Sequence, residues 1–182
     1  MISCNLSLVK YTFTILMFDC WLFEKGVLAI QEIIEKITDF CYSFGEKYPN
    51  SHEFFQSSLY DLLQKEGCKI GIEYEIIFDC VKANGDIVRR RGFIDIFATI
   101  EEKKIAIEFD NGNNLKLKSI SKLLQSNADI RIGVVRGNQR ANVWPSNKRR
   151  IAYVMRRLEI LRKPLFLIIN SHKSASWIYP FP

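Results

Sequence analysis

Three acidic side chains near the middle of the chain, Asp95, Glu108 and Asp110, have a spacing that can bring their carboxylates together. They lie in or directly after two short runs, Phe93–Ile100 and Lys104–Phe109, which are rich in Ile, Phe and Thr. A polar E-E-K-K stretch separates the two runs. Residues that favour strands, interrupted by a short polar turn, predict a β-hairpin.

The position of the turn fixes which side chains face each other. If Glu101 and Glu102 form the tip, the residue numbers of cross-strand partners add up to 203, and Asp95 lies opposite Glu108. Directly paired residues share a face of the hairpin, with Cβ atoms about 5 Å apart. Asp110 follows Glu108 by two residues and therefore shares this face. We expect the three carboxylates to converge on one side of the hairpin.

Three carboxylates in such a position predict a bound cation. Like charges placed close together repel, and burying them is costly unless a cation lies between them. Carboxylate oxygens with no Cys or His nearby suit a hard ion, Mg²⁺ or Mn²⁺. Asp95, Glu108 and Asp110 are therefore the predicted metal ligands. The alternative is a surface hairpin with solvated acids, which is the common outcome for any single Asp or Glu.

The distribution of charge indicates a polyanionic substrate. The 182 residues, 48% of them apolar, are enough for one globular core. Residues 1–85 contain 7 Lys+Arg and 12 Asp+Glu, a net charge of −5, whereas residues 86–182 contain 19 and 8, a net charge of +11. An acidic metal site within a basic half suits double-stranded DNA. The alternative is that the basic residues only keep the surface soluble.

Cysteine content and the N-terminal segment bear on localisation. The five cysteines include no C-x-x-C pair and only two histidines accompany them, so no zinc site is predicted and a reducing cytoplasm is expected. Residues 1–23 are apolar and aromatic, but they lack a cleavage site and are too short to span a membrane. We interpret them as a strand or buried arm that could contact a partner chain.

The order of predicted elements gives the fold class. Strands that alternate with helices toward the end of the chain predict an α/β fold, with a mixed central β-sheet flanked by helices and an N-terminal helical extension. The expected domains are an arm and helix over residues 1–50 and a core over residues 51–182. Helices are predicted over Glu24–Gly45, Ser51–Glu66, Lys116–Gln125 and Ser146–Arg162, and strands over Lys69–Val81, the two hairpin runs, Ile130–Val135 and Leu165–Asn170.

The pattern D-x12-E-x-D on a hairpin, after a helix that begins near Glu53, resembles the PD-(D/E)XK nuclease superfamily. The similarity covers about residues 51–135 and includes the segments G-F-I-D, ending at Asp95, and I-A-I-E-F-D-N-G, which contains Glu108 and Asp110. The second segment is similar to the E-x-D-G segment of very-short-patch-repair-type endonucleases and to the cleavage domains of Type IIS restriction enzymes.

The resemblance implies a restriction-endonuclease-like fold and a role for each matching residue. Asp95 and Glu108 would bind the metal, and Glu53 would assist through water or a second metal. The chain departs from the family at Asp110, where the family carries Lys, so the ammonium group must come from elsewhere. The candidates are Lys116, Lys118 and Lys122, of which Lys118 and Lys122 rank equally as the catalytic lysine.

These features together predict a Mg²⁺-dependent DNA endonuclease. The chain has few residues to spare for reading a DNA sequence, so we expect the cleavage subunit of a heterodimeric restriction enzyme that relies on a larger partner. One alternative is a compact homodimeric restriction or repair nuclease, and another is a non-catalytic DNA-binding or assembly module. The expected DNA-contacting residues are Arg89, Arg90, Arg91, Lys116, Arg136, Arg140, Lys148, Arg149 and Arg150.

Overall fold

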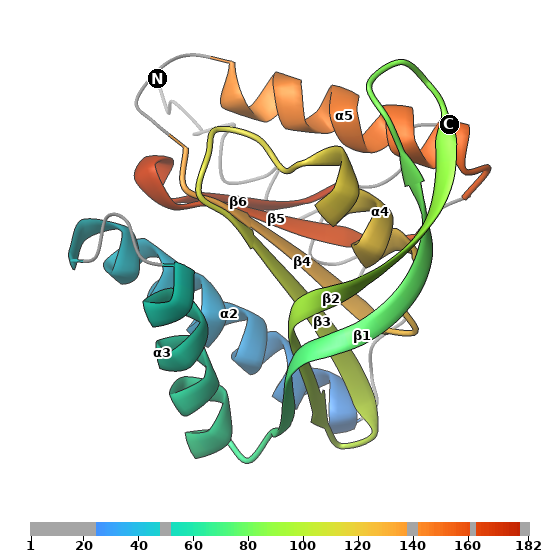
Figure 1. Cartoon of the computed structure of the whole chain (residues 1–182). Coiled ribbons are helices and arrows are strands. Elements are labelled where there is room, and N and C mark those ends of the chain that lie inside the picture. Colours follow the sequence, from blue (N-terminus) through green and yellow to red (C-terminus); the bar gives the residue numbers. More distant parts are fainter. Residues whose placement is uncertain (1–24, 48–51, 138–141, 161–162, 179–182) are drawn as a thin grey trace, which may run out of the picture.

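The computed structural model describes residues 25–47, 52–137, 142–160 and 163–178. Two helices and three strands come first, and strands and helices alternate after them (Figure 1). The predicted arm over residues 1–23 and the predicted DNA contact Arg140 lie outside the described residues. The elements are α2 (Lys25–Lys47), α3 (His52–Lys65), β1 (Lys69–Val81), β2 (Ile87–Ile100), β3 (Lys103–Asp110), α4 (Leu117–Gln125), β4 (Ile130–Val135), α5 (Val143–Arg157), β5 (Leu165–Ile169), the 3₁₀ turn η1 (Asn170–His172) and β6 (Ser174–Ile178).

A six-stranded mixed sheet forms the centre of the fold, with its strands in the order β1-β2-β3-β4-β5-β6. Strands β1, β2 and β3 are antiparallel, β3, β4 and β5 are parallel, and β6 is antiparallel to β5. Helices α2 and α3 bury apolar side chains against one face of the sheet, and α4 and α5 against the other (Figure 1). The predicted class, an α/β fold with a mixed sheet flanked by helices, is confirmed.

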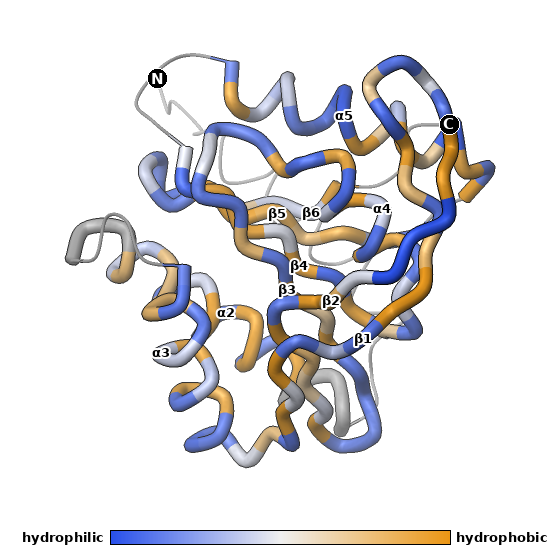
Figure 2. Tube along the Cα trace, viewed as in Figure 1, coloured by the Kyte–Doolittle hydropathy of each residue, from blue (hydrophilic) through white to orange (hydrophobic). Residues whose placement is uncertain are grey.

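Apolar side chains of α2, among them Ile33, Ile37 and Cys41, share one buried cluster with α3 and the sheet. The helix that the sequence assigns to an N-terminal extension is thus packed into the core. Figure 2 shows the apolar positions concentrated on the strands and on the inner sides of the helices. None of the helices in the described part of the chain is long and apolar enough to cross a membrane.

Two elements near the C-terminus differ from the sequence prediction. Helix α5 begins at Val143 rather than Ser146, and Pro145 lies in its first turn, where proline's missing N–H removes no helical hydrogen bond. The helix ends at Arg157 rather than Arg162. The sequence analysis did not predict strand β6, because S-A-S-W-I is short and only Trp177 and Ile178 are strong strand formers.

The β2–β3 hairpin has the predicted register. Ile100 pairs with Lys103 and Ile96 pairs with Ile107, so partner numbers add up to 203. Followed from the hairpin tip, this ladder stops at Ile96, the residue that comes directly after Asp95 in the sequence. From there β2 continues with β1 alone, as a two-stranded ribbon that leaves the main sheet (Figure 1). Asp95 therefore lies where β2 separates from β3.

The strands twist sharply at this point. Phe97 and Ile94 both pack on the α4 and α5 side of the sheet, although Ile96 between them packs on the α2 and α3 side. Strict alternation would place Ile94 and Phe97 on opposite faces. On β1, Glu73 lies between the residues that pair with Ile96 and Ile94, and it has a positive φ of 54°. The local departure from regular β geometry turns the backbone around Asp95.

The tip of the hairpin gives a test of this register. Glu101 and Glu102 both have positive φ, 45° and 68°, as a type I′ turn requires. Glutamate is poorly suited to this conformation, whereas Asn-Gly is the preferred pair. We expect the double substitution Glu101→Asn/Glu102→Gly to raise the free energy of unfolding by about 1 kcal/mol, measured by urea denaturation.

The neighbouring strand residue serves as the control for that substitution. Lys103→Gly adds glycine to a strand and should lower the free energy of unfolding by about 0.5–1 kcal/mol. If the tip variant is destabilised as much as Lys103→Gly, the assigned turn conformation is wrong.

Candidate functional site

Asp95 is held at the point of strand separation by its side chain and its backbone. Its Oδ2 accepts a hydrogen bond from the backbone N–H of Phe109 at 2.8 Å, beyond the last backbone pair of the ladder. Its carbonyl oxygen accepts a hydrogen bond from Gln56 Nε2 of α3 at 2.7 Å. The carboxylate is therefore fixed relative to both β3 and α3.

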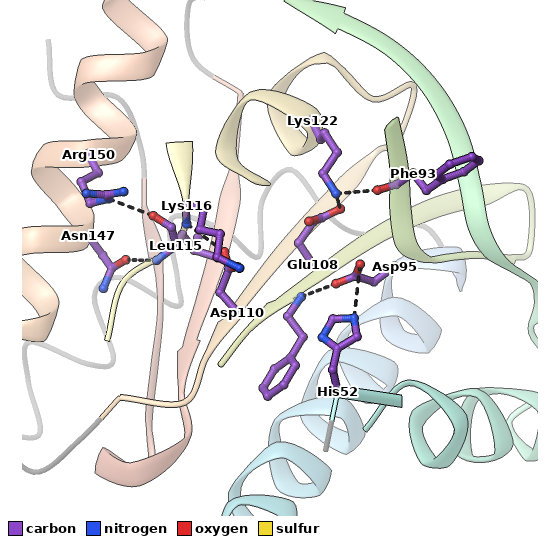
Figure 3. A network of polar contacts seen from close by, with 11 residues as sticks. His52, Phe93, Asp95, Glu108, Asp110, Leu115, Lys116, Lys122, Asn147 and Arg150 are labelled. Carbon is purple, nitrogen blue, oxygen red and sulfur yellow. Dashed lines mark hydrogen bonds and ion pairs between the residues drawn. The ribbon is translucent and has the colours of Figure 1, made fainter. Parts of the chain in front are cut away.

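His52, which the sequence analysis did not single out, contacts Asp95. Its Nε2 lies 3.6 Å from Asp95 Oδ1, and its ring lies beside that of Phe109, with the centroids 5.6 Å apart (Figure 3). His52 and Gln56 are four residues apart, so they share one side of α3. The predicted residue Glu53 is exposed in the first turn of this helix. The i, i+4 pair H-x-x-x-Q was the signal available in the sequence.

Glu108 is almost fully enclosed, with 2% of its surface exposed. It forms an ion pair with Lys122, which extends from α4 and is itself buried (Figure 3). The Lys122 ammonium also donates a hydrogen bond to the carbonyl oxygen of Phe93 at 2.5 Å. The contact with Lys122 is made by Glu108 Oε1. The buried carboxylate thus has a cationic partner within the protein.

Burial shifts the acidity of both central carboxylates. Loss of water, together with the nearby charge of Asp95, raises the pKa of Glu108 to about 8, against the opposing effect of Lys122. Burial also raises the pKa of Asp95, whereas the Phe109 N–H, His52 and Lys122 lower it. Both groups therefore lie in an environment that would stabilise additional positive charge.

Asp110 is buried at the end of β3 and turns toward the start of α4. Its Oδ2 accepts a hydrogen bond from the backbone N–H of Lys116 at 2.8 Å, and its Oδ1 lies 3.1 Å from Lys116 Nζ. The side chain of Lys116 is 75% exposed, so this ion pair borders solvent. The third predicted ligand is partnered by a lysine, as Glu108 is.

The structure distinguishes the two lysines that the sequence ranked equally. Lys122 reaches Glu108, whereas Lys118 is exposed, with its Cε 3.7 Å from the position that a Cβ on Gly92 would occupy. Lys118 therefore lies over the β1–β2 ribbon. Ser119 and Lys122 are three residues apart and lie on the side of α4 that faces Glu108.

Several of the predicted DNA-contacting residues already have partners in the protein. Arg91 forms an ion pair with Glu75, and Arg89 lies 3.4 Å from Asp79, both across the β1–β2 ribbon. Arg90 is exposed on the same strand. The others divide between the end of β4 and helix α5: Arg136 donates to Asn111 at 3.4 Å, Arg150 donates to the Leu115 carbonyl at 2.9 Å, Lys148 lies over the Trp144 ring, and Arg149 is exposed.

The arrangement bears on the predicted metal site. In the described parts of the chain, no group of three or more His, Cys, Asp or Glu side chains is arranged to hold a metal ion. Two of the three predicted ligands, Glu108 and Asp110, instead have lysine partners. The charge of Asp95 is close enough to raise the pKa of Glu108, so these two carboxylates are the nearest to a cation site.

No protein-family model, curated protein or solved structure significantly matches this chain. The functional argument therefore depends on the geometry of the site. Its essential elements are the buried carboxylate of Glu108 and the partly buried carboxylate of Asp95 from adjacent strands, a buried lysine from α4, and a histidine from α3 at the solvent side.

The raised pKa of Glu108 predicts how stability depends on pH. Because its pKa is about 8 in the folded protein and 4.5 ordinarily, the folded protein retains a proton that the unfolded chain releases between these values. The free energy of unfolding should therefore fall as the pH rises through this window. We expect Glu108→Gln, which cannot ionise, to make the fall shallower, as measured by urea denaturation from pH 5 to pH 8. Equal slopes for the two proteins would show that Glu108 is ionised throughout.

Proposed function

We propose that this chain is a Mg²⁺- or Mn²⁺-dependent DNA endonuclease with a restriction-endonuclease-like core. The observation that carries the proposal is the convergence of Asp95, Glu108 and Lys122 from β2, β3 and α4 at the point where two strands separate. The element order α3-β1-β2-β3-α4-β4 agrees with the order expected from the sequence resemblance.

The donor set fits a hard divalent ion. Asp95 and Glu108 would hold it, since both are carboxylates and burial raises the pKa of both. Asp110 would join them if its ion pair with the exposed Lys116 opened. When bound, the metal supplies an activated water and neutralises charge on the phosphate.

The protein's own residues have distinct roles in this proposal. Lys122 lies beside Glu108 and would stabilise the negative charge that develops on the phosphate during attack by water. The reaction breaks one P–O bond and yields a phosphate monoester and a sugar hydroxyl. The Phe109 N–H and His52 hold the Asp95 carboxylate in place, which keeps the two acids close together.

The basic surface around the site supports DNA as the substrate. Lys116, Lys118 and Arg90 are exposed at the start of α4 and on the adjoining ribbon. Lys148 and Arg149 are exposed near the start of α5. Such residues bind the phosphate backbone and release counterions, so binding should weaken as salt increases. Arg89 and Arg91 contribute less, because Asp79 and Glu75 already neutralise them.

Sequence recognition by a larger partner remains part of the proposal. The described helices all pack on the central sheet, which leaves no separate DNA-reading module within the described residues. A second copy of the chain is the alternative source of recognition. A non-catalytic DNA-binding module is favoured by one observation, namely that lysines already partner Glu108 and Asp110.

Cleavage of supercoiled plasmid DNA with Mg²⁺ tests the enzyme proposal. We expect Asp95→Asn, Glu108→Gln and Lys122→Met each to lower the cleavage rate by about 10²-fold or more, because each removes a group that acts on the phosphate or the metal. Glu75→Gln is the matched control, since it removes an acid from the exposed side of the ribbon. Circular dichroism checks the fold of every variant.

The same assay separates the remaining alternatives. Cleavage by the chain alone supports a self-contained nuclease, whereas cleavage only with lysate from the source organism, and only with intact Glu108, supports a partner-dependent subunit. DNA binding that is equal with and without Mg²⁺ and unaffected by Asp95→Asn, in the absence of any cleavage, would overturn the proposal in favour of the binding module.

A further inference from the structure

Leu115 lies between the carboxylate of Asp110 and the start of α4, and both of its backbone groups are held by side chains of α5. Its N–H donates a hydrogen bond to Asn147 Oδ1 at 2.8 Å. Its carbonyl oxygen accepts one from Arg150 Nε at 2.9 Å (Figure 3). A loop residue that gives both backbone groups to one helix is fixed in position relative to that helix.

Asn147 is completely buried, and its amide is fully used in this contact. Besides accepting from Leu115, it donates to the carbonyl oxygens of Asn113 at 3.1 Å and Val143 at 2.8 Å. Two of these three partners belong to the loop that follows β3. Replacing a buried side chain with such partners leaves backbone groups unsatisfied.

The side chain of Leu115 is packed as tightly as its backbone is held. It is fully buried against Gly133 of β4, where an added Cβ would lie only 2.4 Å from Leu115 Cδ1. Gly133 pairs with Glu108 in the parallel ladder of β3 and β4. Leu115 therefore fits into a gap beside the strand position that carries the buried carboxylate.

The fixed residue determines the geometry of the two residues that partner the carboxylates. Lys116 comes next and gives both its N–H and its Nζ to Asp110. Helix α4 then begins at Leu117, and its Lys122 reaches Glu108. A shift at Leu115 would move both lysines relative to their carboxylates.

We propose that Asn147 and Arg150 are positioning residues for the candidate site, acting through Leu115 on Lys116 and Lys122. For Arg150 this replaces the sequence-based expectation of a DNA-phosphate contact. The effect on catalysis rests on the proposed nuclease function, whereas the effect on the loop and α4 does not. The competing explanation is that the two residues serve only the stability of the fold.

The first experiment compares Arg150→Met with Arg149→Met, its exposed neighbour on α5. DNA affinity is measured as a function of salt, and cleavage is measured in single turnovers at saturating DNA. DNA affinity falls as salt rises, and loss of one phosphate contact makes the slope of log affinity against log salt less steep by about 1. We expect Arg150→Met to leave this slope unchanged and to lower the single-turnover rate by about 10-fold.

The conservative variant sharpens this comparison. Lys can still donate to the Leu115 carbonyl, so Arg150→Lys should recover most of the single-turnover rate. If Arg150→Met makes the dependence of DNA affinity on salt less steep and leaves the cleavage rate at saturating DNA unchanged, the positioning role is wrong. Arg150 would then be a DNA-phosphate contact, as the sequence analysis expected.

The second experiment needs no catalytic activity, so it separates failure of this inference from failure of the proposed function. Hydrogen exchange of the Leu115 and Lys116 amides is measured in Asn147→Ala and Arg150→Met. We expect exchange about 5-fold or more faster than in the native chain, with the Val134 amide in the central sheet unchanged. Val154→Ala, a buried apolar substitution in α5, is the control for general destabilisation. Exchange at Leu115 no faster than in this control would overturn the inference.

Discussion

A carboxylate enclosed by protein on a central strand needs a proton or a cation, and Glu108 has Lys122. This buried ion pair constrains much of the surrounding structure. It requires α4 to lie at a fixed rotation over β3, with Ser119 and Lys122 toward the sheet. Removing one partner of such a pair typically costs about 3–5 kcal/mol, because the other charge remains buried. The pair is therefore weak evidence for stability, but a strong constraint on how the helix docks.

The second constraint is the separation of β2 from β3 at Asp95. If the ladder continued, the backbones of these strands would pair. Instead, the Asp95 carboxylate accepts a hydrogen bond from the backbone N–H of Phe109. The two strands diverge at this point, and His52 and Gln56 of α3 contact Asp95 there. Two raised carboxylate pKa values in one opening are unfavourable for folding alone. Such clusters occur most often at functional sites, which is the physical basis for proposing one here.

The sequence predicted the parts of the site that depend on local rules. Asp95 and Glu108 were placed together because the period of a strand is two and a polar turn fixes the register. The sequence analysis did not identify His52, and it could not decide whether Lys118 or Lys122 is the catalytic lysine. Both choices depend on how a helix is rotated about its axis, which is set by packing against the sheet. Asn147 carried no signal, since its partners are backbone groups of a loop more than 30 residues away. The α/β class followed from the order of elements, whereas the short strand β6 depends on pairing with β5.

The central claim is that Asp95 and Glu108 together bind a divalent cation. The most direct measurement is a Mn²⁺ titration of the protein labelled with ¹³C at its carboxyl carbons, followed by paramagnetic broadening in NMR spectra. The account predicts that the Asp95 and Glu108 signals broaden at lower Mn²⁺ than those of the exposed Glu101 and Glu102, and that excess Mg²⁺ reverses the effect. Broadening confined to exposed acids, with Glu108 unchanged, would contradict the account and leave the Glu108–Lys122 pair as a structural feature alone.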